Sequence, residues 1–407
     1  MALEVFNKDE TLQMRRKLIG KQPCRLFFVH DPVKIMRAMD CISDVQHGKD
    51  ILTCIGTLSP QHHSAAAAQM DLLNSNTRFL HDNIVLYANR LAATLPKNLV
   101  SFIWSTQGNN FCVIFTCLSS AYHGHLTSLI DISPYKFRKL EGQKEWVHVA
   151  PLPDTYHGIY REDHLDPGQA YADTVKSLIE EAHKEVFTQI IFPTGYCKRL
   201  AEYVHEAGGV YVADEIQTGF GHVGSHFWAF QLQGEDFCPD IVRMGKLMGN
   251  GHHIACVATT EEIADAFTAS GVEYFNTFGG NPVSCAIGLA VLDVIEKEDL
   301  RGKAVLVGGH LKQLLLQLQT KHPLIGDVRG VGLFIGMELV KDRVSKATEG
   351  SAHLVQEERI VMSTDGPRDS VIKFKPPMCF SIEDAERVST CIDQILGGWY
   401  EKLTVCL

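Results

Sequence analysis

Two charged residues in the middle of the chain lie where an open α/β sheet would place a ligand site. Asp214 follows Val210–Ala213, a fully apolar run that predicts a buried strand, and ligands bind outside the carboxyl ends of such strands. Lys246 follows a second short strand pattern and has three glycines nearby. A lysine in a desolvated pocket has a lowered pKa and can form a Schiff base with a carbonyl group. Taken singly, the aspartate could instead cap a turn, and the lysine could be a solvated surface charge.

A loop that contains Thr277 offers a place for an anion. Phe278 and two glycines separate this hydroxyl from Asn281, a good N-cap, and Pro282, which suits the first position of a helix. Free amide groups and the dipole at a helix start attract phosphate, although an ordinary capped helix needs no ligand. Farther upstream, Tyr122 beside His123 could stack on a flat heterocycle or belong to the core.

Together these residues match the functional groups of one cofactor, pyridoxal phosphate. The aspartate suits a pyridine nitrogen, the lysine an aldehyde, the threonine loop a phosphate and the tyrosine a ring face. An acid that keeps the ring protonated makes the ring an electron sink. The combination is far more specific than its parts and predicts a pyridoxal phosphate site.

The elements that would position these residues alternate between helix and strand. Tyr196–Ala207 has apolar residues at helical spacing and is followed by two glycines and the apolar strand. A continuous apolar stripe predicts a helix over Asn281–Lys297, and Val371–Phe374 predicts a strand of a separate small layer. Ser381 with Asp384 resembles a capping box that opens the last helix. We expect three parts in chain order: an N-terminal segment 1–38 that packs with the small domain, a large α/β domain 39–300 and a small α+β domain 301–407.

Composition favours a compact, soluble, intracellular protein. The 407 residues are 45% hydrophobic and 21% charged, which excludes wholesale disorder. The net charge of −10 includes no basic stripe, so nucleic acid and membrane are not expected as partners. Twelve scattered cysteines are typical of reduced thiols, and no apolar run reaches the roughly 18 residues of a membrane span. The acidic start resembles neither a secretory signal nor a clear mitochondrial presequence.

Several motifs together resemble the class-III aminotransferase family, over most of the chain from about residue 10 to residue 396. The central motifs are Val212–Gly221, Gly245-Lys246 and Thr277–Pro282. Three further segments resemble the ethanolamine-phosphate and 5-phosphohydroxylysine phospho-lyase branch: Tyr122–Tyr135, Val147–Pro151 and Tyr274–Cys285. The resemblance implies a fold-type-I pyridoxal phosphate enzyme. Its large, mostly parallel, doubly wound sheet domain would be joined to a small C-terminal α+β domain.

The resemblance also implies roles for individual residues. Lys246 would be the Schiff-base lysine, and Asp214 would pair with the pyridinium nitrogen. Thr277 would bind the cofactor phosphate across the interface of a homodimer. By family resemblance the protein would be mitochondrial, with the cytoplasm as the alternative.

Four more residues would surround the cofactor ring in this family. Ile216 and Tyr122 would pack on its two faces, with His123 beside the tyrosine. Gln217 would reach the phenolic oxygen of the ring.

One position in the last strand bears on the substrate. Class-III transaminases usually place an arginine just before the Pro-Pro of this strand, where it clamps an α-carboxylate, but here Lys373 and Lys375 precede it. Lysine is a point charge without the bidentate fork of arginine. This favours a substrate without an α-carboxylate, such as phosphoethanolamine, with Lys373 as a candidate contact. Both lysines could equally face water.

The chain also departs from the family pattern. Ser105–Asn110 stands where the family has a Ser-Gly-Ser-Glu-Ala-Asn loop whose amides hold the cofactor phosphate. We expect a hairpin at 38–40, the helix and strand before Tyr122 and a glutamate-bearing strand at 183–190 to be missing. A missing internal strand would leave ladder groups unpaired. Loss of the phosphate loop could remove hydrogen bonds worth about 1.5–3 kcal/mol each.

Histidine also stands at two positions where the family has other residues, His222 for arginine and His253 for proline. His222 and His226 are four apart, but Gly224 between them argues against a helix. We therefore predict no metal site.

The leading hypothesis is a pyridoxal phosphate lyase that eliminates phosphate from a phosphorylated amine such as phosphoethanolamine, giving aldehyde, ammonia and phosphate. Lys246 would take a proton from the carbon that bears nitrogen, while Asp214 keeps the ring protonated. The first alternative is a class-III aminotransferase acting between an amino acid and a keto acid. The second is a catalytically impaired family member without the phosphate loop.

Overall fold

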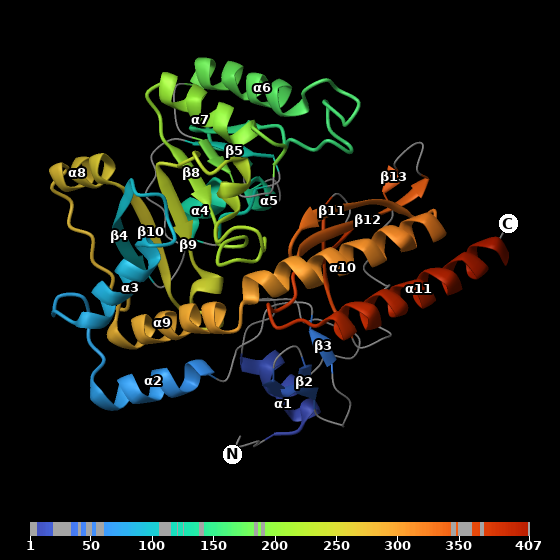
Figure 1. Ribbon diagram of the computed structural model, residues 1–407, viewed down its shortest axis with the longest axis horizontal. Coiled ribbons are helices and arrows are strands. Elements are labelled where there is room, and N and C mark those ends of the chain that lie inside the picture. The colour runs from blue at the N-terminus through green and yellow to red at the C-terminus, as the bar shows by residue number, and fades with distance from the viewer. Residues whose placement is uncertain are drawn as a thin grey trace. The chain divides into compact units, whose positions relative to one another are not determined.

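The computed structural model divides into two compact units, one of Met1–Pro60 with Leu306–Leu407 and the other of Gln61–Val305 (Figure 1). The domain boundaries predicted at residues 38 and 300 stay predictions. The residues that the structure describes are 6–18, 34–39, 42–45, 51–53, 61–105, 115–119, 121–124, 126–137, 142–182, 186–188, 192–342, 347–348, 360–366 and 370–405. None of the helices in these ranges is both long enough and apolar enough to cross a membrane.

One large sheet lies at the centre of Gln61–Val305. Its strands are β4 (Leu99–Ser105), β5 (Phe115–Leu118), β6 (Val147–Ala150), β7 (Val186–Thr188), β8 (Tyr211–Asp214), β9 (Ile241–Met244) and β10 (Ala255–Thr260). Among the described residues the order across the sheet is β4-β10-β9-β8-β7-β5-β6. All neighbours from β6 to β9 are parallel, whereas β10 is antiparallel to β9 and to β4. The mostly parallel sheet agrees with the predicted architecture.

The expectation of missing strands is wrong at two places. A strand, β5, precedes Tyr122, and β7 occupies the segment where the second strand was expected to be lost, although its Val-Phe-Thr sequence carries no glutamate. Because β7 pairs with β5 on one side and β8 on the other, the sheet has no gap at this position. The expected loss of the phosphate loop and of the helix after it falls on 106–114, outside the described residues.

The helices of this unit have the bounds α2 (Gln61–Leu72), α3 (Asp82–Ala92), α4 (Thr127–Asp131), α5 (Pro134–Phe137), α6 (Pro167–Ala182), α7 (Tyr196–Glu206), α8 (Glu261–Ala269) and α9 (Pro282–Lys297), with 3₁₀ turns η1 (Ala229–Gln233) and η2 (Lys246–Met248). Helices α6 and α7 lie side by side next to the sheet, and α9 contacts both α2 and α3 (Figure 1).

The local sequence signals around the site form the predicted elements. Helix α7 buries its apolar face and ends just before the glycine pair, and every residue of β8 is buried. At the start of α9, the Asn281 side chain accepts a hydrogen bond from the Ser284 amide, and Pro282 takes the first turn. Asparagine caps satisfy amides that no helical carbonyl can reach.

The other unit holds two further sheets and the long C-terminal helices. Its strands are β1 (Ile35–Met39), β2 (Ile42–Val45), β3 (Ile51–Thr53), β11 (Ile325–Val331), β12 (Phe334–Asp342), β13 (Ala347–Thr348), β14 (Ile360–Val361), β15 (Ser363–Asp365) and β16 (Val371–Phe374). The sheet orders are β1-β2-β3-β14 and β11-β12-β16-β15, with β13 beside β12. The helices are α1 (Lys8–Leu18), α10 (Leu300–Lys321), which begins in the other unit, and α11 (Ile382–Val405).

Two details of this unit bear on the sequence predictions. Strands β1 and β2 pair antiparallel, so a hairpin is present where one was expected to be missing. The capping box before α11 is confirmed, because the Asp384 amide donates to Ser381 Oγ and the Ser381 amide donates to the Asp384 carboxylate.

Candidate active site

Asp214 is the last residue of β8, and its side chain is fully buried. Strand β9 runs parallel beside it, in a register that places Asp214 next to Arg243. The carboxylate therefore lies at the carboxyl edge of the parallel strands, where the sequence predicted a ligand site. A buried carboxylate requires partners, since an isolated charge in a protein interior is strongly disfavoured.

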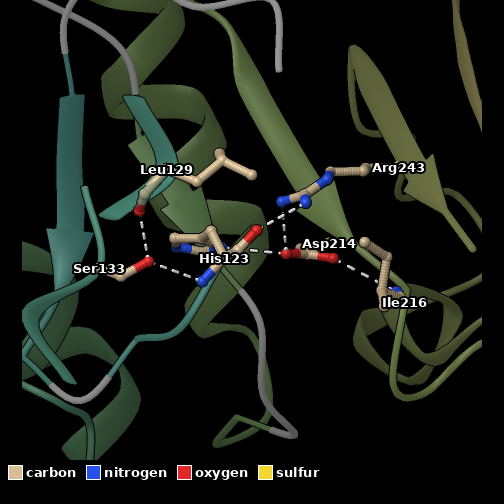
Figure 2. A network of polar contacts seen from close by, with 6 residues as sticks. All are labelled: His123, Leu129, Ser133, Asp214, Ile216 and Arg243. Atoms are coloured by element: carbon tan, nitrogen blue, oxygen red, sulfur yellow. Dashed lines mark hydrogen bonds and ion pairs between the residues drawn. The ribbon is translucent and has the colours of Figure 1, made fainter. Parts of the chain in front are cut away.

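Two buried side chains bind the same oxygen of Asp214 (Figure 2). Arg243 Nη1 and His123 Nδ1 each lie 3.0 Å from Oδ2. Arg243 Nη2 donates to the His123 carbonyl at 2.7 Å, so the guanidinium holds both partners. The His123 amide donates to Ser133 Oγ at 2.8 Å, and Ser133 donates to the Leu129 carbonyl. The network connects β8 and β9 to the segment between β5 and α5.

Charge and burial act in opposite directions on this network. Burial by itself would raise the pKa of Asp214, but the Arg243 charge and the His123 hydrogen bond lower the pKa below its ordinary value. Burial, together with the Arg243 charge, lowers the pKa of His123 below its ordinary value, although the neighbouring carboxylate raises it. The histidine is therefore neutral near pH 7, and its Nδ1–H donates to an ionised Asp214.

Lys246 follows β9 and begins η2 with an unusual backbone conformation. Its φ is 26°, in a region that side-chain-bearing residues rarely adopt, and its side chain is exposed. Strain of this kind concentrates at functional sites, and here it supports the choice of Lys246. A methyl group added to Gly245 would lie 3.6 Å from the Ile216 side chain, so the chain before Lys246 passes close to Ile216.

The other residues predicted to surround the cofactor ring differ in their contacts with Asp214. The Ile216 amide donates to Asp214 Oδ1 at 3.3 Å, and the Ile216 side chain is buried. Gln217 and Tyr122 are half-buried, and the Tyr122 ring meets Tyr135 edge-on at 6.0 Å. His123 is joined directly to Asp214, which the resemblance did not specify.

Neither Thr277 nor Lys373 takes part in the described hydrogen bonds of this network. Thr277 is exposed, and the nearby Phe278 and Gly279 amides donate to Asn276 Oδ1, so these amides are engaged within the loop. Lys373 is in β16 of the other unit, where its ammonium group lies 3.0 Å from the Asp365 carboxylate.

Sequence reasoning missed Arg243, which completes the charge balance of the site. The available signal was a cation inside the otherwise apolar strand Ile241–Met244, because arginine is rarely buried without a partner. His222 is buried and His253 is exposed. In the described ranges no three His, Cys, Asp or Glu side chains are arranged to hold a metal ion.

Glu215 is a second buried acid that sequence reasoning missed. It accepts hydrogen bonds from the Thr218 hydroxyl and from the Ala229 and Phe230 amides. Burial nevertheless raises its pKa to about 7. The folded protein therefore binds a proton that the unfolded chain releases near pH 4.5. The stability from Glu215 is fully present below that pH and is lost as the pH rises through about 7.

We predict that Glu215→Gln reduces the pH dependence of the protein's stability. The melting temperature of the wild type should fall as the pH rises from 5 to 7.5. The part of this fall that comes from Glu215 should be absent in the variant, because glutamine does not titrate. Differential scanning fluorimetry at several pH values measures the slope. Glu202→Gln, at an exposed position of α7, is the matched control and should leave the slope unchanged. Equal slopes in Glu215→Gln and the wild type would contradict the prediction.

The acid of this site fits the cofactor predicted from the sequence. Asp214 is ionised, and its Oδ1 receives one amide at the long distance of 3.3 Å among the described contacts. A carboxylate oxygen has two lone pairs, so Oδ1 has capacity for a protonated ring nitrogen. Asp214, Ile216 and His123 would hold the ring, and Lys246 would supply the amine.

Comparisons with known proteins identify the class. The model of the family "Aminotransferase class-III" matches residues 107–396. A Drosophila melanogaster protein described as alanine–glyoxylate aminotransferase 2-like is 40% identical over the whole chain and 89% of its own length. The chain therefore belongs to the class-III aminotransferase family. Pyridoxal phosphate is its cofactor, and the prediction of a fold-type-I enzyme is confirmed.

More specific relatives lie in the phospho-lyase branch. The chain is 36% identical to the Caenorhabditis elegans ethanolamine-phosphate phospho-lyase homolog 1, over 97% of this chain and 94% of that protein. A solved phospholyase from Arthrobacter in complex with phosphoethanolamine superposes with a TM-score of 0.85 and 27% identity, covering 95% and 99% of the two chains. Two further relatives, from Arabidopsis thaliana and human, are each 34% identical and are named as mitochondrial proteins.

Proposed function

We propose that this protein is a phospho-lyase that acts on a phosphorylated amine such as phosphoethanolamine and gives an aldehyde, ammonia and phosphate. The observation that carries the proposal is the ionised, buried Asp214 held by His123 at the carboxyl edge of β8. The similarity to a phospho-lyase homolog over almost the full length supports the substrate class.

The chain's own residues would perform three tasks. When bound, pyridoxal phosphate supplies an aldehyde for the substrate amine and a ring that accepts electrons. Asp214 would hold negative charge at the ring nitrogen, and His123 would fix the orientation of that carboxylate. Lys246 would accept the proton from the carbon that bears nitrogen. Overall, one water is consumed, the carbon–oxygen bond to phosphate breaks, and the amine leaves as ammonia.

Two measurements test this proposal in sequence. Borohydride reduction of the full chain with added pyridoxal phosphate, followed by peptide mapping, should label Lys246. Separately, protein that has not been reduced should release phosphate from phosphoethanolamine without any keto acid. Labelling of Lys246 with transfer of the amino group to a keto acid and no phosphate release would replace the lyase by an aminotransferase. Absence of label at Lys246 would contradict both.

Two observations favour the alternative functions, an aminotransferase and a catalytically impaired family member. The fly relative has an aminotransferase name, which favours a transaminase as the second candidate. The same comparison runs over 459 aligned positions against 407 residues in this chain, so at least 52 positions face a gap here. Such gaps are the reason to consider a catalytically impaired family member. A protein of that kind would stay colourless after incubation with the cofactor.

Lys373 is the proposed contact for the anionic end of the substrate. We predict that Lys373→Met raises the KM for phosphoethanolamine about 10- to 100-fold, because a hydrogen bond to a charged group contributes about 1.5–3 kcal/mol. Steady-state phosphate release measures the effect. Lys375→Met, two residues along the same segment, is the control and should change KM less than threefold. An unchanged KM in Lys373→Met would assign this lysine to its Asp365 ion pair alone.

We also propose that the protein is a homodimer, with Thr277 at the phosphate of the partner's cofactor. An exposed apolar surface supports this: Phe79, Leu80, Phe275 and Phe278. Arg78 joins the two loops that carry this surface. It pairs with Glu273, and its guanidinium lies 4.4 Å from the centre of the Phe275 ring. Contiguous exposed apolar surface is typical of an interface.

We predict that Phe278→Asp shifts this dimer toward monomer. Phe278 is 66% exposed, so the change should preserve the fold but bury a charge in the interface. Analytical ultracentrifugation should show the dimer dissociation constant rising by about tenfold or more. Leu165→Asp is the control, because this exposed leucine lies outside the surface. The prediction fails if both variants dissociate equally.

A further inference from the structure

Arg243 is a buried cation for which the proposed reaction has no direct use. Its side chain is 3% exposed. It lies on β9, between β8 and β10, and its guanidinium contacts the Asp214 carboxylate and the His123 carbonyl. Because guanidinium remains charged at every relevant pH, Asp214 has a permanent countercharge.

The geometry distinguishes the two oxygens of Asp214. Oδ2 receives both Arg243 and His123 at 3.0 Å, whereas Oδ1 receives the Ile216 amide at 3.3 Å. A cationic ring nitrogen would have to share this one carboxylate with the guanidinium. Two cations on one carboxylate repel each other, and burial strengthens that repulsion because little water screens it.

We propose that Arg243 is a positioning residue that takes up part of the negative charge of Asp214 and so weakens the preference of the site for a protonated ring nitrogen. The inference rests on the proposed function, since it assumes that Asp214 faces the cofactor ring. Arg243 keeps the acid ionised and oriented when the ring is absent. The same contact makes the ring nitrogen less basic when the ring is bound.

The test compares the binding of two ligands to the full chain by fluorescence titration. One is pyridoxal phosphate, and the other is its 1-deaza analogue, in which carbon replaces the ring nitrogen. The ratio of the two dissociation constants reports the ring nitrogen alone, because every other contact is shared. A cation within a few ångströms shifts a pKa by about 1–3 units, so Arg243→Met should raise the preference for pyridoxal phosphate about tenfold or more. Arg243→Lys, which retains the charge, should stay within about threefold of the wild type.

A second measurement needs no variant and keeps the test decisive if Arg243→Met does not fold. In the wild type the preference for pyridoxal phosphate over the deaza analogue should be below about tenfold, since Arg243 offsets Asp214. A larger preference would overturn the inference, as would an unchanged ratio in a folded Arg243→Met. Both results leave the proposed function intact. Failure of the wild type to bind either ligand would instead overturn the proposed function.

Discussion

Replacing Asp214 with alanine is expected to lower the melting temperature by roughly 6–20 °C and to weaken cofactor binding. The change removes the carboxylate that Arg243 and His123 bind inside the protein. Breaking a buried ion pair by removing one partner costs about 3–5 kcal/mol, because the remaining charge loses its compensation. For a unit of about 250 residues, each kcal/mol corresponds to about 2–4 °C. Scanning fluorimetry of the cofactor-free protein measures the shift.

The double variant Asp214→Ala/Arg243→Met is the matched control. With both charges removed, the burial penalty disappears, and we expect at least half of the lost melting temperature to return. The cofactor affinity should remain below that of the wild type, because the acid is still absent. A single variant Asp214→Ala that melts within 2 °C of the wild type would show that this pair does not stabilise the fold.

The second large effect is expected at Lys246. Lys246→Ala should eliminate borohydride-stable attachment of pyridoxal phosphate and reduce phosphate release by at least about 10²- to 10⁴-fold, the usual contribution of one positioned proton acceptor. The side chain is exposed, so the free energy of unfolding should change by only about 0.5 kcal/mol. Peptide mapping and a phosphate assay measure the two losses.

Lys246→Arg separates charge from chemistry. Arginine retains the positive charge but does not lose its proton, so it can neither attack an aldehyde nor accept a proton. We expect this variant to resemble Lys246→Ala in both assays. Retention of a reduced cofactor adduct on the chain of Lys246→Ala would locate the reactive amine at another lysine.

Much of the site's framework could be predicted from local patterns. A single stretch of chain contains the apolar face of α7, the two glycines that follow this helix and the apolar strand β8. All three are present as predicted. The Asn281 cap and Pro282 likewise define the start of α9. These signals work because the side chains involved interact with backbone only a few residues away.

The loss of sheet strands was predicted wrongly from the same sequence. The segment before Tyr122 and the segment at Val186–Thr188 were both expected to lack a strand, yet both pair with neighbouring strands. Backbone hydrogen bonds make a strand from many sequences, so a changed sequence does not by itself remove an element. Motif comparison is sensitive to side chains, whereas the sheet depends first on the backbone.

The sequence by itself determined the fold class, the cofactor and the candidate acid and lysine, because each follows from residue types at short spacings. Only the tertiary structure decided what surrounds the acid. Arg243 meets Asp214 because β8 and β9 pair in one register, and His123 reaches the same oxygen from a segment 91 residues away. Strand register and long-range burial arise from the packing of the whole sheet, and they set the charge of Asp214 and the raised pKa of Glu215.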